Sequence, residues 1–112
     1  MGQTFYIVDV FAEEKYTGNE LAVVRQAQTL SDLEMQKIAR EVNFSETAFI
    51  LRDEESRGGF EARIFPPTEE LPFAGHPTLG TAFIVQQEIL KAPVTEVVLN
   101  LKIGPIPVTF TY

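Results

Sequence analysis

Short apolar runs, either alternating with polar residues or rich in β-branched side chains, recur along the chain and predict strands. In the first run Phe5 and Ile7 alternate with Tyr6 and Val8, so we expect a strand that is buried on both faces. Gly18-Asn19 and Gly104-Pro105 are typical turn sequences. We expect strands over residues 3–10, 21–24, 47–51, 60–65, 94–101 and 106–112.

A capping box predicts the start of a first helix. Ser31 and Glu34 have the spacing at which the hydroxyl and the carboxylate each accept a backbone N–H at a helix N-terminus. Apolar residues then follow at three-to-four-residue spacing, which indicates an amphipathic surface helix. The residues expected on its buried side are Leu33, Met35, Ile38, Ala39 and Val42.

The second predicted helix covers residues 77–90, with Pro77 in its first turn, where the missing N–H costs nothing. This segment is apolar nearly all round, a property of helices that the rest of a fold buries. We therefore expect an α+β domain of order β-β-α-β-β-α-β-β. Its mixed and antiparallel strands wrap around the second helix, and the first helix lies on the surface.

Composition narrows the functional classes. The net charge of −7 repels phosphate backbones and anionic lipids, so we expect neither nucleic acid nor a membrane as partner. The chain has no Cys and one His, too few for a zinc site, and no nucleotide-binding glycine motif, so no metal or cofactor is expected. No export signal is evident at the N-terminus, and a cytoplasmic location is the expectation.

Two segments contain residue types that often take part in catalysis or ligand binding. They are residues 43–47 and 73–80, and both lie at the ends of predicted elements. Glu46 directly precedes the expected strand over residues 47–51, and partial burial at the mouth of that strand suits a carboxylate to general-base work, although an exposed Glu can also simply end a strand. His76 precedes a helix and can donate to a substrate carboxylate, or it can cap that helix.

The glycines of the second segment allow a similar pair of interpretations. Gly75 fits a turn conformation that a side chain would block, and Gly80 allows close approach to the first turn of the helix. An anion held there would gain from the helix dipole. A tight turn that only packing requires explains the same glycines.

Four segments together resemble the N-terminal domain of the PhzF-like family of phenazine biosynthesis, whose fold is similar to that of diaminopimelate epimerase. They are residues 8–11, 18–24, 43–49 and 65–80. The pair Ser45-Glu46-Thr47 and Gly75-His76-Pro77-Thr78 is the most specific part of the resemblance. The family fold, strands rolled around one long helix in each of two similar domains, agrees with the predicted order of elements.

The resemblance implies an isomerase that works without a metal or an organic cofactor. Glu46 would take a proton from one carbon of a small cyclic carboxylate, similar to dihydro-hydroxyanthranilate, and return it to another. His76 would assist, and Ser45, Gly75 and Thr78 would hold the substrate carboxylate. Because the chain has no Cys, racemisation by opposed thiols, which other proteins of this fold use, is excluded.

Two features depart from the family. Glu20 stands where a Pro is usual after Gly-Asn. Residues 1–112 correspond to a single domain without the family's second domain, so a second copy in a homodimer, or another chain, would have to complete the site. A ligand-binding or assembly module without turnover, or a truncated remnant of the enzyme, remain alternatives.

Overall fold

The computed structural model describes residues 5–10, 19–73 and 75–110, and the side chains at 8–10, 19 and 76 lie outside that description. The described residues confirm the predicted order of strands and helices. The strands are β1 (Phe5–Val10), β2 (Asn19–Val24), β3 (Glu46–Ile50), β4 (Phe60–Phe65), β5 (Glu96–Leu101) and β6 (Gly104–Thr109). The helical elements are η1 (Ala27–Thr29), α1 (Asp32–Val42), α2 (Gly75–Ile84) and η2 (Val85–Leu90), a π-helical continuation of α2.

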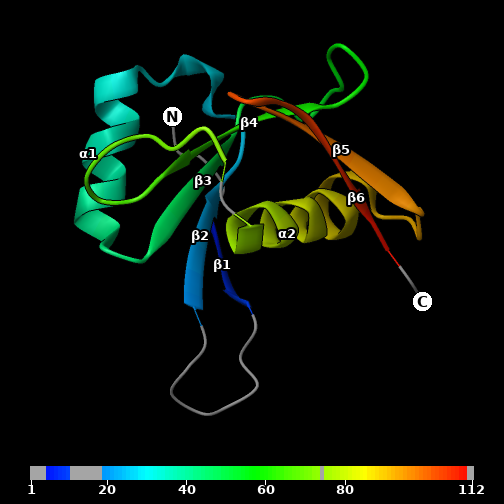
Figure 1. Cartoon of the computed structure of the whole chain (residues 1–112), viewed down its shortest axis with the longest axis horizontal. Coiled ribbons are helices and arrows are strands. Elements are labelled where there is room, and N and C mark those ends of the chain that lie inside the picture. The colour runs from blue at the N-terminus through cyan, green and yellow to red at the C-terminus, as the bar shows by residue number, and fades with distance from the viewer. Residues whose placement is uncertain (1–4, 11–18, 74, 111–112) are drawn as a thin grey trace.

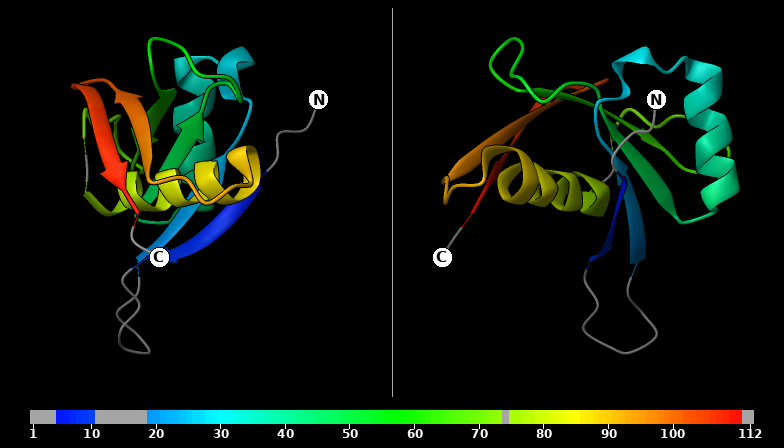
Figure 2. Two further views of the ribbon diagram at one scale, coloured as in Figure 1. Left: turned by 90° about the vertical axis from the view of Figure 1, so that its right-hand side faces the viewer. Right: turned by 180° about the vertical axis from the view of Figure 1, so that it is seen from behind.

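The strands form one six-stranded mixed sheet in the order β1-β2-β3-β4-β5-β6. The pairs β1–β2, β3–β4 and β5–β6 are antiparallel, and β2–β3 and β4–β5 are parallel. The sheet bends around α2, which runs between the β1–β3 part and the β5–β6 hairpin, while α1 covers the outer face (Figures 1 and 2). The predicted α+β architecture, strands wrapped around a central apolar helix, is therefore confirmed.

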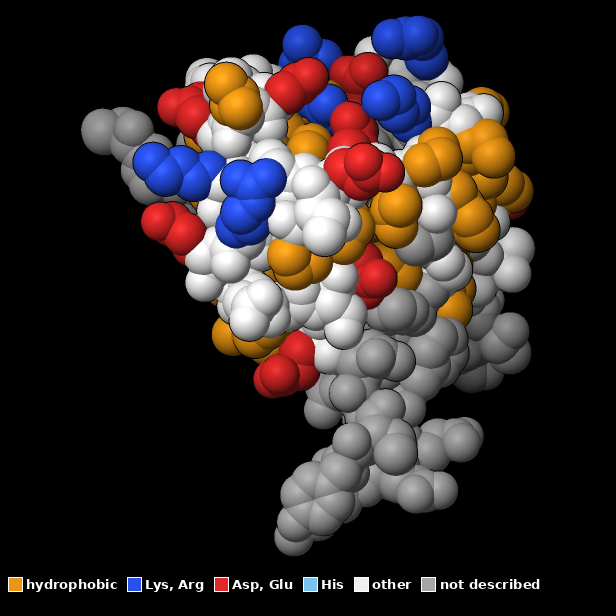
Figure 3. Space-filling view, turned by 60° about the vertical axis from the view of Figure 1, so that its left-hand side comes forward, with side chains coloured by type: hydrophobic (Ala, Val, Ile, Leu, Met, Phe, Trp, Pro, Cys, Tyr) orange, Lys and Arg blue, Asp and Glu red, His pale blue; other side chains and the backbone are white. Residues whose placement is uncertain are grey.

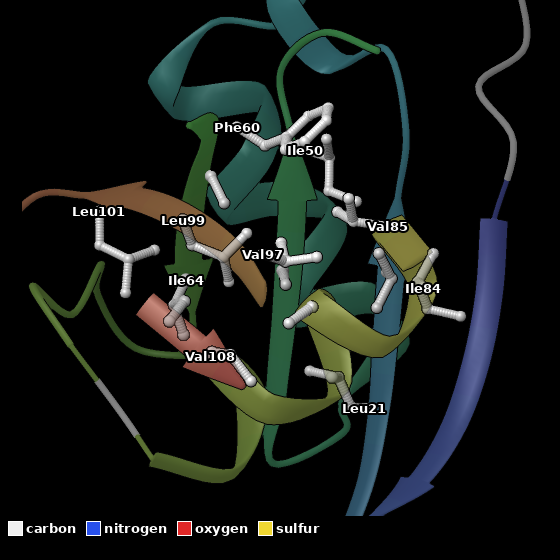
Figure 4. Close-up of a cluster of buried hydrophobic side chains, with 14 residues drawn as sticks. Leu21, Ile50, Phe60, Ile64, Ile84, Val85, Val97, Leu99, Leu101 and Val108 are labelled. Atoms are coloured by element: carbon white, nitrogen blue, oxygen red, sulfur yellow. The ribbon is translucent and has the colours of Figure 1, made fainter. Parts of the chain in front are cut away.

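Alternation along the strands divides the buried side chains between two cores. Leu21, Ala48 and Ile50 belong to the larger core, which packs against α2 (Figure 4). Phe49, from the opposite face of β3, belongs to the smaller core beneath α1. Because successive residues of a strand point to opposite faces, β3 is buried on both sides along most of its length.

The predicted capping box is present at the start of α1. The backbone N–H of Glu34 donates to Ser31 Oγ at 3.1 Å, and Ser31 N–H donates to Glu34 Oε1 at 2.8 Å. Met35 and Ala39 are buried as expected, but the expectation for Leu33 is wrong because this residue is 83% exposed. Leu33 lies two residues before Met35, which places it on nearly the opposite side of a helix with 3.6 residues per turn.

Replacing Ser31 with Ala should lower the free energy of unfolding by about 1 kcal/mol, because one N-terminal donor of α1 loses its acceptor. Denaturant unfolding measures the change. Ser31→Asp is the matched control, since its carboxylate can accept the same N–H, and it should remain close to the parent. Equal losses in both variants would contradict a capping role.

The second helix begins earlier than predicted and is less completely buried. It starts at Gly75, and Pro77, Thr81 and Val85 point into the core. The Thr81 hydroxyl donates to the Pro77 carbonyl at 2.6 Å, which satisfies a polar group inside the fold. Leu79 and Phe83 lie four residues apart and are both exposed, so one stripe of this apolar helix faces outward.

Two expectations for the strands are wrong. β1 is an edge strand, and Phe5 and Ile7 on one of its faces are exposed, so it is not buried on both sides. Gly104 and Pro105 belong to β6, and the turn falls at residues 102–103 instead. Proline is compatible with β6 because an edge strand leaves one row of backbone groups unpaired. Of the predicted Gly18-Asn19 turn, Asn19 starts β2 and Gly18 lies outside the described residues.

Candidate functional site

Glu46 is the first residue of β3 and lies beside Leu21 of β2 in the parallel register. Ala48 and Ile50 face the α2 side of the sheet, so strand alternation directs Glu46 toward that side as well. Its side chain is half-buried, and the Oε1 atom is shielded from solvent. The structure therefore directs the carboxylate toward the interior at the end of a strand that two neighbours hold in place.

The two neighbours of Glu46 have different environments. Ser45 precedes the strand and is exposed. Thr47 is fully buried on the opposite face of β3, and its hydroxyl has no hydrogen-bond partner among the described residues. Of the three consecutive residues, only Glu46 combines a titratable group with the α2 side of the sheet.

The start of α2 forms one wall of a groove of about 450 Å³. Thr78 is buried at this wall, and Gly75 is exposed at its rim. The opposite wall comes from the C-terminal half of β6. The lining residues are Phe73, Gly75, Thr78, Leu79, Ile106, Pro107, Val108 and Thr109.

The predicted conformational role of Gly75 is wrong. Among the described residues the glycines with positive φ are Gly58 and Gly104. A Cβ added at Gly75 would meet no atom within 4 Å, so a side chain would not be blocked. Gly75 thus leaves open space at the first turn of α2 instead of supplying a left-handed turn.

The structure brings part of the predicted site together. Gly75 and Thr78 share the groove, and α2, which carries them, packs against β2 and β3, the strands beside and containing Glu46. Ser45 and Glu46 are not among the groove residues. The side chain of His76 lies outside the described residues, although its backbone belongs to the first turn of α2.

The β6 wall of the groove was not predicted from the sequence. Phe73 lies in the segment 73–80 that the sequence indicates for chemistry, but Ile106 and Val108 are predicted only as strand residues. Their alternation with Pro107 and Thr109 gives a strand but does not indicate which helix that strand will face. The wall depends on the bend of the sheet around α2, which sequence periodicity does not encode.

The described part of the chain contains no cluster of three or more His, Cys, Asp or Glu side chains that could hold a metal ion. Within the same residues, every helix is too short or too polar to cross a membrane. Basic and acidic side chains are interspersed on the face shown in Figure 3, which lacks a large patch of one sign.

Comparisons with solved structures support the fold in detail. A PhzF-family phenazine biosynthesis protein from Enterococcus faecalis superposes with a TM-score of 0.85 at 36% identity, covering 99% of this chain and 41% of that one. A predicted epimerase from Pseudomonas aeruginosa gives a TM-score of 0.80 at 38% identity, over 95% of this chain and 37% of the other. The epimerase-like fold that the resemblance implied is confirmed.

Sequence comparisons agree. An uncharacterised isomerase of Pasteurella multocida is 51% identical over 85 residues, which is 76% of this chain and 29% of the relative. The trans-2,3-dihydro-3-hydroxyanthranilate isomerase of Pseudomonas aeruginosa is 42% identical over 103 residues, 92% of this chain and 36% of the relative. The chain thus spans about a third of the length of these curated relatives. Residues 8–112 match the family described as phenazine biosynthesis-like protein, and the chain belongs to that family.

Proposed function

We propose that this chain supplies one half of a cofactor-independent isomerase active site, in which Glu46 moves a proton between two carbons of a small cyclic carboxylate. The observation that carries the proposal is the position of Glu46 at the end of β3, directed toward α2 with Oε1 shielded from solvent. Membership of a family with relatives named isomerases supports the reaction class.

The substrate and the product of this reaction contain the same atoms. The Glu46 carboxylate removes a proton from one ring carbon, and the electron pair of that C–H bond enters the conjugated system. The same carboxyl group then returns the proton to a different ring carbon, so a double bond changes position. A carboxylate held near the reacting carbons can contribute roughly 10²–10⁴-fold to such a transfer.

The start of α2 is the proposed carboxylate-binding element. Backbone N–H groups of a first helical turn have no partner within the helix and favour an anion. Gly75 leaves room for a ligand beside them, and Thr78 lines the groove. In the proposal Ser45 adds a contact from the β3 side, and His76 assists the proton transfer.

Glu46 is not among the residues that line the groove, so we propose that a second half completes the site. That half is a second copy of this chain, as in a homodimer, or a further domain. Dihydro-hydroxyanthranilate is the first substrate to test, because relatives carry its isomerisation in their names.

The test is proton exchange into trans-2,3-dihydro-3-hydroxyanthranilate in deuterated water, followed by NMR, together with the solution mass by light scattering. We expect deuterium at ring carbons to appear at a rate that rises with the fraction of dimer. A dimer that incorporates no deuterium would contradict the proposed function. A monomer that exchanges protons would contradict completion by a second copy.

The absence of Glu46 from the residues that line the groove favours a second candidate, ligand binding without turnover. In that case the groove would bind a carboxylate through the start of α2, and Glu46 would only end a strand. Calorimetric binding of the same compound without deuterium incorporation would support this candidate over the isomerase.

A further inference from the structure

The loop that leads into α2 is attached to the rest of the fold by ionic and backbone contacts. It runs from Pro66, after β4, to the start of α2 at Gly75. Gln36 of α1 donates to the Pro66 carbonyl at 2.9 Å. At the other end, Ile103 N–H donates to the Pro72 carbonyl at 3.3 Å.

The strongest attachment is an ion pair in the middle of this loop. Arg63 of β4 donates to both carboxylate oxygens of Glu70, with Nε–Oε2 at 2.9 Å and Nη2–Oε1 at 2.7 Å. Two parallel hydrogen bonds fix the direction of the carboxylate as well as its distance. The adjacent Leu71 N–H donates to the carbonyl of Ile64, the residue after Arg63, at 2.9 Å.

Both partners of this pair are held in a largely buried setting. The Glu70 side chain is 12% exposed, and Lys102 approaches Oε1 at 3.5 Å. Arg63 also lies 5.3 Å from the centre of the Phe65 ring. The hydrogen bonds from Arg63 lower the pKa of the Glu70 carboxyl, which therefore stays ionised near neutral pH.

Arg63 has a second acceptor of a different kind. Its Nη1 donates to Asp32 Oδ1 of α1 at 2.8 Å, but the Asp32 side chain is 79% exposed. Solvent competes with such an exposed contact, and exposed pairs contribute little. The two partners of Arg63 therefore offer a comparison between a sheltered contact to the loop and an exposed contact to a helix.

We propose that Arg63 and Glu70 are positioning residues, which hold the loop so that the first turn of α2 presents Gly75 and Thr78 to the groove. Glu70 lies only five residues before Gly75, so a shift of its attachment point changes the path by which the chain enters α2. The proposal rests on the proposed function for its effect on substrate, but the attachment itself can be tested without turnover.

Amide hydrogen exchange of the full chain, followed by NMR, tests the attachment. In Glu70→Gln we expect exchange at the non-proline residues of 71–80 to accelerate roughly three- to tenfold, while Met35–Ala39 of α1 keeps its rate. Arg63→Lys should accelerate exchange in the same residues, because a Lys cannot form the bidentate contact. Asp32→Asn and the exposed neighbour variant Glu69→Gln are controls that should leave residues 71–80 unchanged.

Two results would overturn this proposal. Unchanged exchange at residues 71–80 in Glu70→Gln would show that the pair does not hold the loop. Equal acceleration throughout α1 and the loop would show a general loss of stability instead of local positioning.

Substrate kinetics then separates this proposal from the proposed function. If the parent chain turns over, Glu70→Gln should raise KM roughly fivefold and change kcat less, because a displaced α2 start weakens carboxylate binding. A large change in kcat with an unchanged KM would contradict a binding role for the loop. If the parent chain shows no turnover or binding, the proposed function fails, and the exchange result still decides the attachment.

Discussion

Replacing Glu46 with Gln should reduce proton exchange into the substrate by at least about a hundredfold, the lower end of what a positioned general base contributes. Gln keeps the size and the polar end of the side chain but cannot accept and return a proton. Since Glu46 is only half-buried at a strand end, the fold should tolerate the amide. Affinity for the carboxylate ligand, measured by calorimetry, should change little.

Glu41→Gln is the matched control. Glu41 is exposed on α1, on the opposite face of the sheet from α2, so the same change of charge should leave exchange intact. If Glu46→Gln retains full exchange, the proton passes through another group and the proposed role of Glu46 is wrong. If both variants lose exchange equally, the net charge and not the position of Glu46 is responsible.

The largest stability change should come from Phe49→Ala, which we expect to lower the free energy of unfolding by about 3–5 kcal/mol. Phe49 is fully buried beneath α1, with its ring 5.5 Å from that of Phe65 in an edge-to-face arrangement. Truncation removes this contact and leaves a cavity between β3 and α1. A domain of this size is stable by roughly 5–15 kcal/mol, so much of the total would be lost.

Leu33→Ala provides the contrast, because it also removes a large apolar side chain but at a position that is 83% exposed. It should change the free energy of unfolding by less than about 0.5 kcal/mol. Thermal and denaturant unfolding followed by circular dichroism measure both variants. A loss at Leu33 comparable to that at Phe49 would contradict the assigned positions of the two side chains.

Local sequence rules predicted the elements of this fold well where the signal was chemical and short-range. Ser31 and Glu34 specify the start of α1, because each satisfies a backbone donor within three residues of itself. The order of strands and helices followed from periodicity in the same way. Local rules failed for Leu33, which was expected on the buried side of α1 and is exposed. They also failed for the turn between β5 and β6, which lies at residues 102–103 and not at Gly104-Pro105.

The candidate site shows the same division. The sequence indicated Glu46 and the segment around Gly75 as places for chemistry, because both lie at the ends of elements. The turn conformation predicted for Gly75 is wrong, because the φ angle of a single residue depends on how the chain enters α2. The face toward which Glu46 points became known only from the cores on either side of β3.

The sequence by itself determined the order of strands and helices, the capping of α1, the apolar character of α2 and the resemblance to the PhzF-like family. Only the tertiary structure decided that β1 is an exposed edge, that β6 and α2 face each other across a groove, and that Arg63 reaches Glu70. The physical reason is the distance along the chain over which each interaction acts. Capping and periodicity act within a few residues, whereas the bend of the sheet around α2 depends on contacts between segments far apart in the chain.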